Sequence, residues 1–312
     1  MIEKYYNGVI EQVAGGIGNV EHNSILVRYS NDFSIWDLES VNHYKDQTDI
    51  FFTCHEFSYN KIAEAYEPYL GLIRQMFHKY CSGTLEEFME ECDVYKLQRP
   101  VFESYFEKGF CERTEQILID EVEYEQERMH SSIVTMLQKL SEICPIVIVL
   151  NRFQLASKST MQLTNRLLQT KNKNIGIVLG VNDVQSIPEF AHEEWDAICE
   201  SMDDRNMVFH IGNAGRNMEP DVMDYYSDYE SDDGYRKLNN LVYFLDFDQA
   251  DHHLSKIERR IKFDNFTIPK KKYYQLLLLQ IMVSILQRDI AKALESCEDL
   301  EKLQDQETEG SF

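Results

Sequence analysis

Short apolar runs alternate with segments of helical spacing over roughly the first two thirds of the chain. Five runs rich in aliphatic and β-branched residues predict buried strands, at 24–29, 49–54, 145–150, 174–181 and 207–211. The run 145–150 is apolar throughout, which is typical of a strand covered on both faces. Strands that alternate with helices in this way predict an α/β fold with a parallel, doubly wound sheet.

Apolar residues at helical spacing predict helices before and between these strands, at 5–13, 33–44, 57–80, 85–140 and 159–169. We expect a break in 57–80 near Pro68, because proline disfavours helix in the residue before it. We expect interruptions in 85–140 around Arg99-Pro100 and at Gly109 for related reasons.

The composition changes abruptly between Glu219 and Gly234, where seven acids and three tyrosines stand close together. The acids lack the spacing of a calcium-binding EF-hand loop, so we expect a solvated linker. This linker, 219–234, would separate an α/β domain at 1–218 from an α-helical domain at 235–312, where no strand pattern occurs.

Two helical segments of the C-terminal domain resemble each other. Leu245 is followed five residues later by Ala250, and Leu286 five residues later by Ala291, at an offset of 41 residues. A small alanine facing a neighbouring helix suits stacked helical hairpins, so we expect a TPR-like arrangement. An ordinary helical bundle is the alternative.

The charge balance limits the partners that the chain can bind. It carries 31 Lys and Arg against 54 Asp and Glu, a formal net charge of −23, which repels nucleic acid and anionic membrane surfaces. Its seven cysteines are scattered without a CxxC pair, which favours a reducing, cytoplasmic location. No apolar run approaches the roughly 20 residues that span a bilayer. We therefore expect protein partners, no direct nucleic acid and no membrane.

The middle of the chain resembles the Walker B segment of STAND ATPases, the AAA-related P-loop module of large LuxR-type regulators. The resemblance runs from Cys144 to Leu168: a proline precedes the apolar strand, and Gln154, Ala156 and Ser159 lead into a leucine-rich helix. Residues 174–182 fit the next strand of the family, which carries the sensor position at its end, here Asn182. The resemblance implies a P-loop-NTPase-like sheet followed by helical repeats.

The residues that ATP hydrolysis requires in this family are replaced. Two acids follow the Walker B strand in the family, where this chain has Asn151 and Arg152, and a later aspartate is Ser157. The first acid would hold magnesium and the second would polarise the attacking water. A neutral amide and a cation can do neither.

The phosphate loop expected after the first strand is also degenerate. Its place falls at 29–36, which contains neither glycine nor lysine, and we assign the degenerate positions to Ser30, Asn31, Asp32 and Phe33. Backbone amides need glycines to wrap phosphates, and lysine supplies the compensating charge. The cluster Gly15-Gly16-Ile17-Gly18 precedes the strand and is not followed by Lys-Ser/Thr, so it is a poor substitute.

These observations predict a pseudo-ATPase: a regulatory or scaffolding protein without catalytic residues, cofactor or metal. Signatures of other enzymes, such as GxSxG and HExxH, do not occur. One alternative is a switch that binds a nucleotide or another metabolite without hydrolysis, with Arg28 or Arg152 meeting the anion. Another is the N-terminal part of a transcription regulator.

Overall fold

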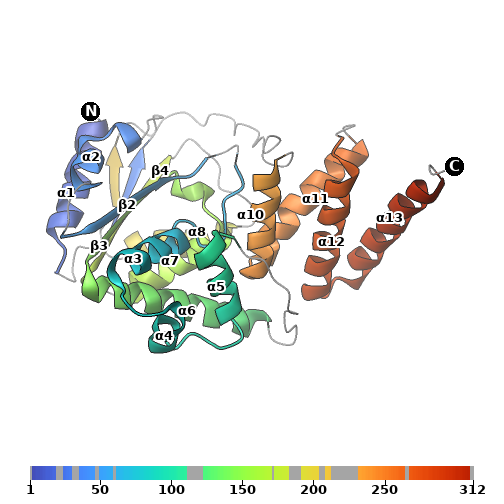
Figure 1. The fold of residues 1–312 in the computed structure, drawn as a ribbon. Helices are drawn as coiled ribbons and strands as arrows, with labels where there is room; N and C mark the ends of the chain where they lie inside the picture. The colour runs from blue at the N-terminus through green and yellow to red at the C-terminus, as the bar shows by residue number, and fades with distance from the viewer. Residues whose placement is uncertain are drawn as a thin grey trace.

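The computed structural model describes residues 2–18, 24–29, 35–45, 49–58, 61–110, 122–170, 172–182, 191–203, 208–211, 231–263 and 267–309. An α/β part is built on a parallel sheet, and a row of helices extends from it toward the C-terminus (Figure 1). The predicted phosphate-loop positions Ser30, Asn31, Asp32 and Phe33 lie outside the described residues.

All five predicted strands are confirmed within about two residues. They are β1 (Ser24–Tyr29), β2 (Phe51–Glu56), β3 (Ile146–Asn151), β4 (Ile175–Asn182) and β5 (Val208–Ile211). The strands pair in the order β2-β3-β4-β1-β5, and every pair is parallel. Strands β3 and β4 are buried along their whole length, as their continuous apolar sequences predict.

Helices cover both faces of this sheet (Figure 1). One face carries α1 (Ile2–Gly15), the short η2 (Ile35–Asp37) and α2 (Glu39–Lys45). The other carries α3 (Tyr69–Tyr80), α6 (Val122–Ile143), α7 (Lys158–Thr170) and α8 (His192–Asp203), with α4 (Leu85–Glu91) and α5 (Arg99–Lys108) between α3 and α6 in the chain. Alternate strand residues serve the two cores: Val147 and Val149 pack toward α1, whereas Ile148 packs on the opposite face.

The helix predicted before Pro68 is wrong. The described residues of this stretch, 57–58 and 61–68, form an extended segment and a turn. Their backbone groups bond to distant parts of the chain: Tyr66 N–H donates to Ser159 Oγ, and Ala63 C=O accepts from Gln249 Nε2. Tertiary hydrogen bonds therefore replace those of a local helix.

The C-terminal part contains α10 (Asp232–Tyr243), α11 (Phe247–Phe263), α12 (Lys270–Leu286) and α13 (Ile290–Glu309). The predicted linker lies outside the described residues up to residue 230, and residues 232–234 begin α10. The main hydrophobic core continues from the sheet into α10, α11 and α12. The Phe244 ring at its centre contacts the rings of Tyr66 and Tyr105.

Two helical hairpins, α10–α11 and α12–α13, share one turn geometry. Leu245 and Arg288 have positive φ angles of 68° and 62°, and the N–H group of the following aspartate donates over 2.8 Å to a carbonyl five residues earlier. Both turns have the Schellman pattern. The structural offset is therefore 43 residues, and the predicted offset of 41 is wrong. At this offset, buried Ala250 corresponds to buried Ala293. Ala291, which the sequence comparison matched with Ala250, is exposed.

Among the described residues, no helix combines the length and apolar character needed to cross a membrane. The six described cysteines are free thiols.

Candidate functional site

Of the predicted site residues, Asn151, Arg152, Gln154 and Asn182 lie within the described part of the chain, and they gather at one edge of the sheet. Tyr29, Glu56, Asn151 and Asn182 are the last residues of β1, β2, β3 and β4. Because the strands are parallel, their carboxyl ends meet where α/β proteins bind ligands. We call these four residues, with Tyr6, Arg152, Gln154 and Gly180, the strand-end cluster.

A hydrogen bond joins β1 to β3 across the strand between them. Tyr29 Oη donates to Asn151 Oδ1 over 2.7 Å, and both side chains are buried. Gly180 of β4 leaves room for this contact, because a Cβ atom there would lie 2.6 Å from Asn151 Oδ1 and would also clash with the Tyr6 hydroxyl. Burial raises the pKa of Tyr6 well above its ordinary value, so its hydroxyl stays neutral. Neutral side chains thus fill the space at the end of β3, where the sequence resemblance places the first Walker B residue.

Arg152 is held by an internal carboxylate. Its guanidinium nitrogen Nη1 lies 3.2 Å from Glu56 Oε1, and both side chains are largely buried. The other oxygen of Glu56 accepts the N–H of Ile35 over 3.2 Å, at the start of η2 and directly after the predicted phosphate-loop positions. A protein carboxylate therefore takes contacts that an anionic ligand could otherwise take.

Gln154 and Asn182 connect the segment after β3 to the end of β4. Gln154 lies in η3 (Phe153–Leu155), and its amide exchanges two hydrogen bonds of 3.4 Å with the backbone of Asn182. Gln154 is completely buried, and Asn182 nearly so. Both residues lie at this edge, where their hydrogen bonds join η3 to the end of β4.

The structure places Arg28 elsewhere. Its guanidinium donates to Cys199 Sγ over 3.2 Å and lies 5.9 Å from the centre of the Trp195 ring, on α8. Of the two arginines proposed to meet an anion, only Arg152 lies in the strand-end cluster. That arginine is paired with Glu56.

The N-terminus of α7 is capped by a residue of the helical part, which the sequence did not predict. Asp246, in the turn between α10 and α11, accepts the N–H of Ser159 over 2.9 Å. Burial raises the pKa of Asp246 to about 6, although the bonds from Ser159 and the charge of Lys158 oppose the shift. The turn of the first hairpin is thereby fixed to the helix that follows β3 and η3.

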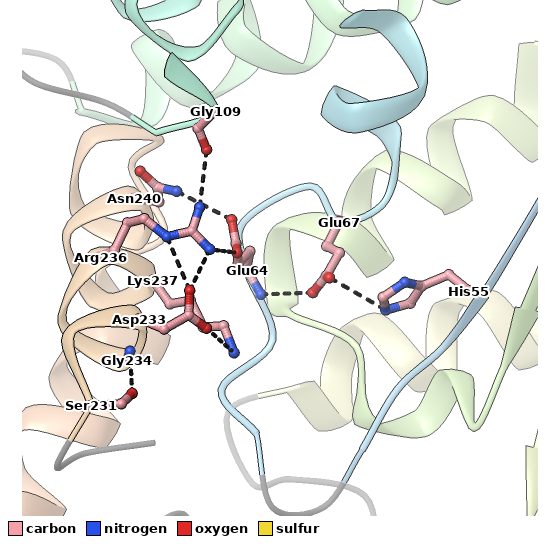
Figure 2. Close-up of polar contacts among 10 residues, drawn as sticks. All are labelled: His55, Glu64, Glu67, Gly109, Ser231, Asp233, Gly234, Arg236, Lys237 and Asn240. Atoms are coloured by element: carbon pink, nitrogen blue, oxygen red, sulfur yellow. Dashed lines mark hydrogen bonds and ion pairs between the residues drawn. The ribbon is translucent and has the colours of Figure 1, made fainter. Parts of the chain in front are cut away.

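A second polar cluster joins α10 to the segment after β2, as Figure 2 shows. Arg236 bonds to Glu64 Oε1 at 3.0 Å, to Asp233 Oδ1 at 2.7 Å and to the carbonyl of Gly109 at 3.1 Å. Asn240 donates to the other oxygen of Glu64 over 3.2 Å. We call this group the Arg236 cluster, and it connects three segments that are far apart in the sequence.

Glu67 extends the Arg236 cluster toward β2 (Figure 2). One of its oxygens accepts the N–H of Glu64 over 3.1 Å, and the other lies 3.5 Å from His55 Nε2. Burial lowers the pKa of His55 to about 4, so its imidazole is neutral at physiological pH. Burial also raises the pKa values of Glu64 and Glu67.

In the part of the chain that the structure describes, no group of three or more His, Cys, Asp or Glu residues could hold a metal ion. Comparisons with protein-family models, with curated proteins and with solved structures found no match to this chain.

Proposed function

We propose that this chain is a non-catalytic regulatory or scaffolding protein that acts through protein contacts. Its α/β part is a degenerate P-loop-ATPase-like module, joined to an α-helical repeat domain. The observation that carries the proposal is the strand-end cluster, where side chains bond to each other at the positions that would serve phosphate and magnesium.

The arrangement of strands supports this ancestry. Asn151 ends β3 and Arg152 follows it, Tyr29 ends β1, and β4, the proposed sensor strand, lies between these two strands. All three positions thus face one edge, as a shared nucleotide site requires.

The chemistry of the cluster supports loss of catalysis. Magnesium bound to ATP needs a carboxylate at the first Walker B position, and the neutral Asn151 amide is already bonded to Tyr29. The Glu56 carboxylate accepts the N–H of Ile35 and would repel a phosphate group placed beside it. For Arg152 to bind a phosphate group, its ion pair with Glu56 would first have to break.

An uncovered apolar face supports a role in protein contacts. Exposed hydrophobic side chains follow one another at helical spacing on α12, at Tyr274, Leu278 and Ile285, and on α13, at Ile290 and Leu294. Each hairpin of a helical array buries its apolar face against the next. We infer that an amphipathic helix of a partner protein packs against these exposed side chains of α12 and α13.

The spacing of the two turns bears on the type of helical repeat that we propose. The 43-residue offset between Leu245 and Arg288 is longer than the 34 residues of a tetratricopeptide repeat and falls within the roughly 40–47 residues of HEAT and armadillo repeats. We therefore propose that the helices form a short array of helical hairpins. The TPR-like arrangement expected from the sequence is one form of such an array.

Two assays test the proposal. Incubation with Mg-ATP should release no phosphate above the rate without protein, and turnover that the Asn151→Ala change removes would refute the loss of catalysis. For the partner surface, a protein captured by the wild-type chain should be lost with Leu278→Glu/Leu294→Glu. It should be retained with Arg259→Glu, a change at an exposed position of α11. If both variants capture the partner protein equally well, the proposed contact surface is refuted.

A further inference from the structure

A pocket of about 530 Å³ lies between α6 and the segment 92–98 that joins α4 to α5. We call it the α6 pocket. Its volume falls in the range of small-molecule sites. None of the residues that line it belongs to the strand-end cluster or to the Arg236 cluster.

Positive charge dominates the lining of the α6 pocket. Lys96, Arg99 and Arg128 line it, against one carboxylate, Asp93. Arg99 uses its Nε to donate to the carbonyl of Val94 over 3.1 Å. Its two terminal nitrogens and the Lys96 ammonium make no hydrogen bond or ion pair with any residue that the structure describes. In a chain with a net charge of −23, such a concentration of cations offers anions a local site.

The third cation is held in a fixed orientation. The Arg128 guanidinium lies 3.9 Å from the centre of the Tyr95 ring and 4.1 Å from that of Tyr124. Glu125 accepts a hydrogen bond from its Nη1 at 3.3 Å. Stacking between two rings restricts the rotamers of the arginine, so less entropy is lost when it binds an anion.

Hydroxyl groups complete the lining on the side of α6. Ser131, Ser132 and Thr135 follow Arg128 by three, four and seven residues, and all four positions line the pocket. These spacings place the side chains on one face of the helix. Ser132 is buried, at 4% exposure, where an amphipathic helix would ordinarily carry an apolar residue.

We propose that the α6 pocket binds a phosphomonoester. The double negative charge of this group matches the excess of cations, and its three terminal oxygens can accept bonds from guanidinium, ammonium and serine hydroxyl donors together. The Thr135 hydroxyl is not among these donors, because it donates to the Ser131 carbonyl over 2.9 Å. The group can belong to a small metabolite or to a phosphorylated side chain. Either source would give the protein a ligand site that is independent of the nucleotide edge.

Calorimetric titration of the full chain with inorganic phosphate tests the site. We expect saturable binding that weakens at least about tenfold in Lys96→Gln/Arg99→Gln, because two charge-assisted bonds are lost. Lys139→Gln is the matched control, because Lys139 is also on α6 but does not line the pocket. This variant should bind phosphate with the affinity of the wild type. Lys96→Gln alone, at an exposed side chain that cannot prevent folding, should weaken binding at least about threefold.

Two further titrations distinguish the sources of the phosphate. A sugar phosphate and a serine-phosphorylated peptide are compared, with the unphosphorylated peptide as the control. Tighter binding of one of them than of inorganic phosphate assigns the source. Absence of binding for all three phosphate-bearing probes, or equal affinity of the wild type and Lys96→Gln, would overturn the proposal.

Discussion

Tyr29 and Asn151 end two strands that are not neighbours, and a 2.7 Å hydrogen bond joins their side chains across β4. The contact passes over Gly180, whose lack of a side chain makes room for it. Tyr29 directly precedes the positions that we assign to a degenerate phosphate loop, and Asn151 stands where we propose that the first Walker B acid has been replaced. In the proposed pseudo-ATPase, this polar contact occupies the part of the sheet edge that an active ATPase would leave open to its ligand.

Gly180→Ala should destabilise the protein by about 1–3 kcal/mol, because the added methyl group overlaps Asn151 Oδ1 and the Tyr6 hydroxyl in a closed core. Gly71→Ala is the control. Gly71 lies in α3 with nothing within 4 Å of the added Cβ, so the change should be neutral or stabilise by up to about 1 kcal/mol. Urea unfolding of both variants measures the difference. Equal stability of Gly180→Ala and the wild type would mean that the edge is not closed.

The pair of Arg152 and Glu56 should be energetically coupled. Removing either partner leaves a largely buried charge, so Arg152→Gln and Glu56→Gln should each cost about 1–3 kcal/mol of unfolding free energy. The double variant should cost less than the two single changes together, by about 0.5–3 kcal/mol. A double-mutant cycle by denaturant unfolding gives this value, and strictly additive costs would show that the pair does not hold the edge.

The strands could be predicted because they depend on local sequence. The run Ile146–Leu150 is apolar without interruption, and only a strand covered on both faces suits it in this context. The proposal that Asn151 and Arg152 replace two acids likewise rests on local sequence alone. The partners of these two residues could not be predicted, because Tyr29 and Glu56 reach them only after the strands have paired.

The polar contacts between the α/β part and the helices were missed for a different reason. Asp246, Glu64 and Asp233 are three of 54 acids, and nothing local separates them from solvated surface residues. A usable signal did exist in the turns. Both hairpins carry an aspartate directly after the residue with positive φ, and aligning Asp246 with Asp289 gives the correct offset. Matching the Leu and Ala residues of the two segments gave the wrong offset of 41 residues.

Asp246→Asn should change how stability depends on pH. Burial raises the pKa of Asp246 from 3.8 to about 6, so the folded state keeps its proton while the unfolded chain has lost it. Its contribution to stability is complete below about pH 4 and is lost as the pH rises to about 6. The asparagine still accepts from Ser159 N–H but does not titrate.

Relative to the wild type, Asp246→Asn should therefore gain stability between pH 4 and pH 7, by up to about 3 kcal/mol. The buried His55 and His130 also titrate in this range, but both chains contain them and their effects cancel in the difference. Denaturant unfolding of both proteins at several pH values measures this difference in stability. A difference that is constant from pH 4 to pH 7 would show that Asp246 has an ordinary pKa.

Arg236→Ala should loosen α10. The change removes bonds to Glu64, Asp233 and the Gly109 carbonyl, with an expected cost of about 1–3 kcal/mol and faster hydrogen exchange at the amides of α10. Arg259→Ala on α11 is the control, because Arg259 is exposed and makes no ion pair with the described residues. Unchanged exchange in α10 with Arg236→Ala would mean that apolar packing alone holds the helix.

The central claim is that the protein's own side chains occupy the former nucleotide site. Calorimetric titration of Mg-ATP into Lys96→Gln/Arg99→Gln tests it most directly, because this variant removes the cations of the α6 pocket. We predict no heat beyond dilution. A ligand at about 100 times its dissociation constant would stabilise the fold by about 2.7 kcal/mol, so we also predict an unchanged melting temperature. Saturable binding of Mg-ATP that Asn151→Ala abolishes would contradict the claim.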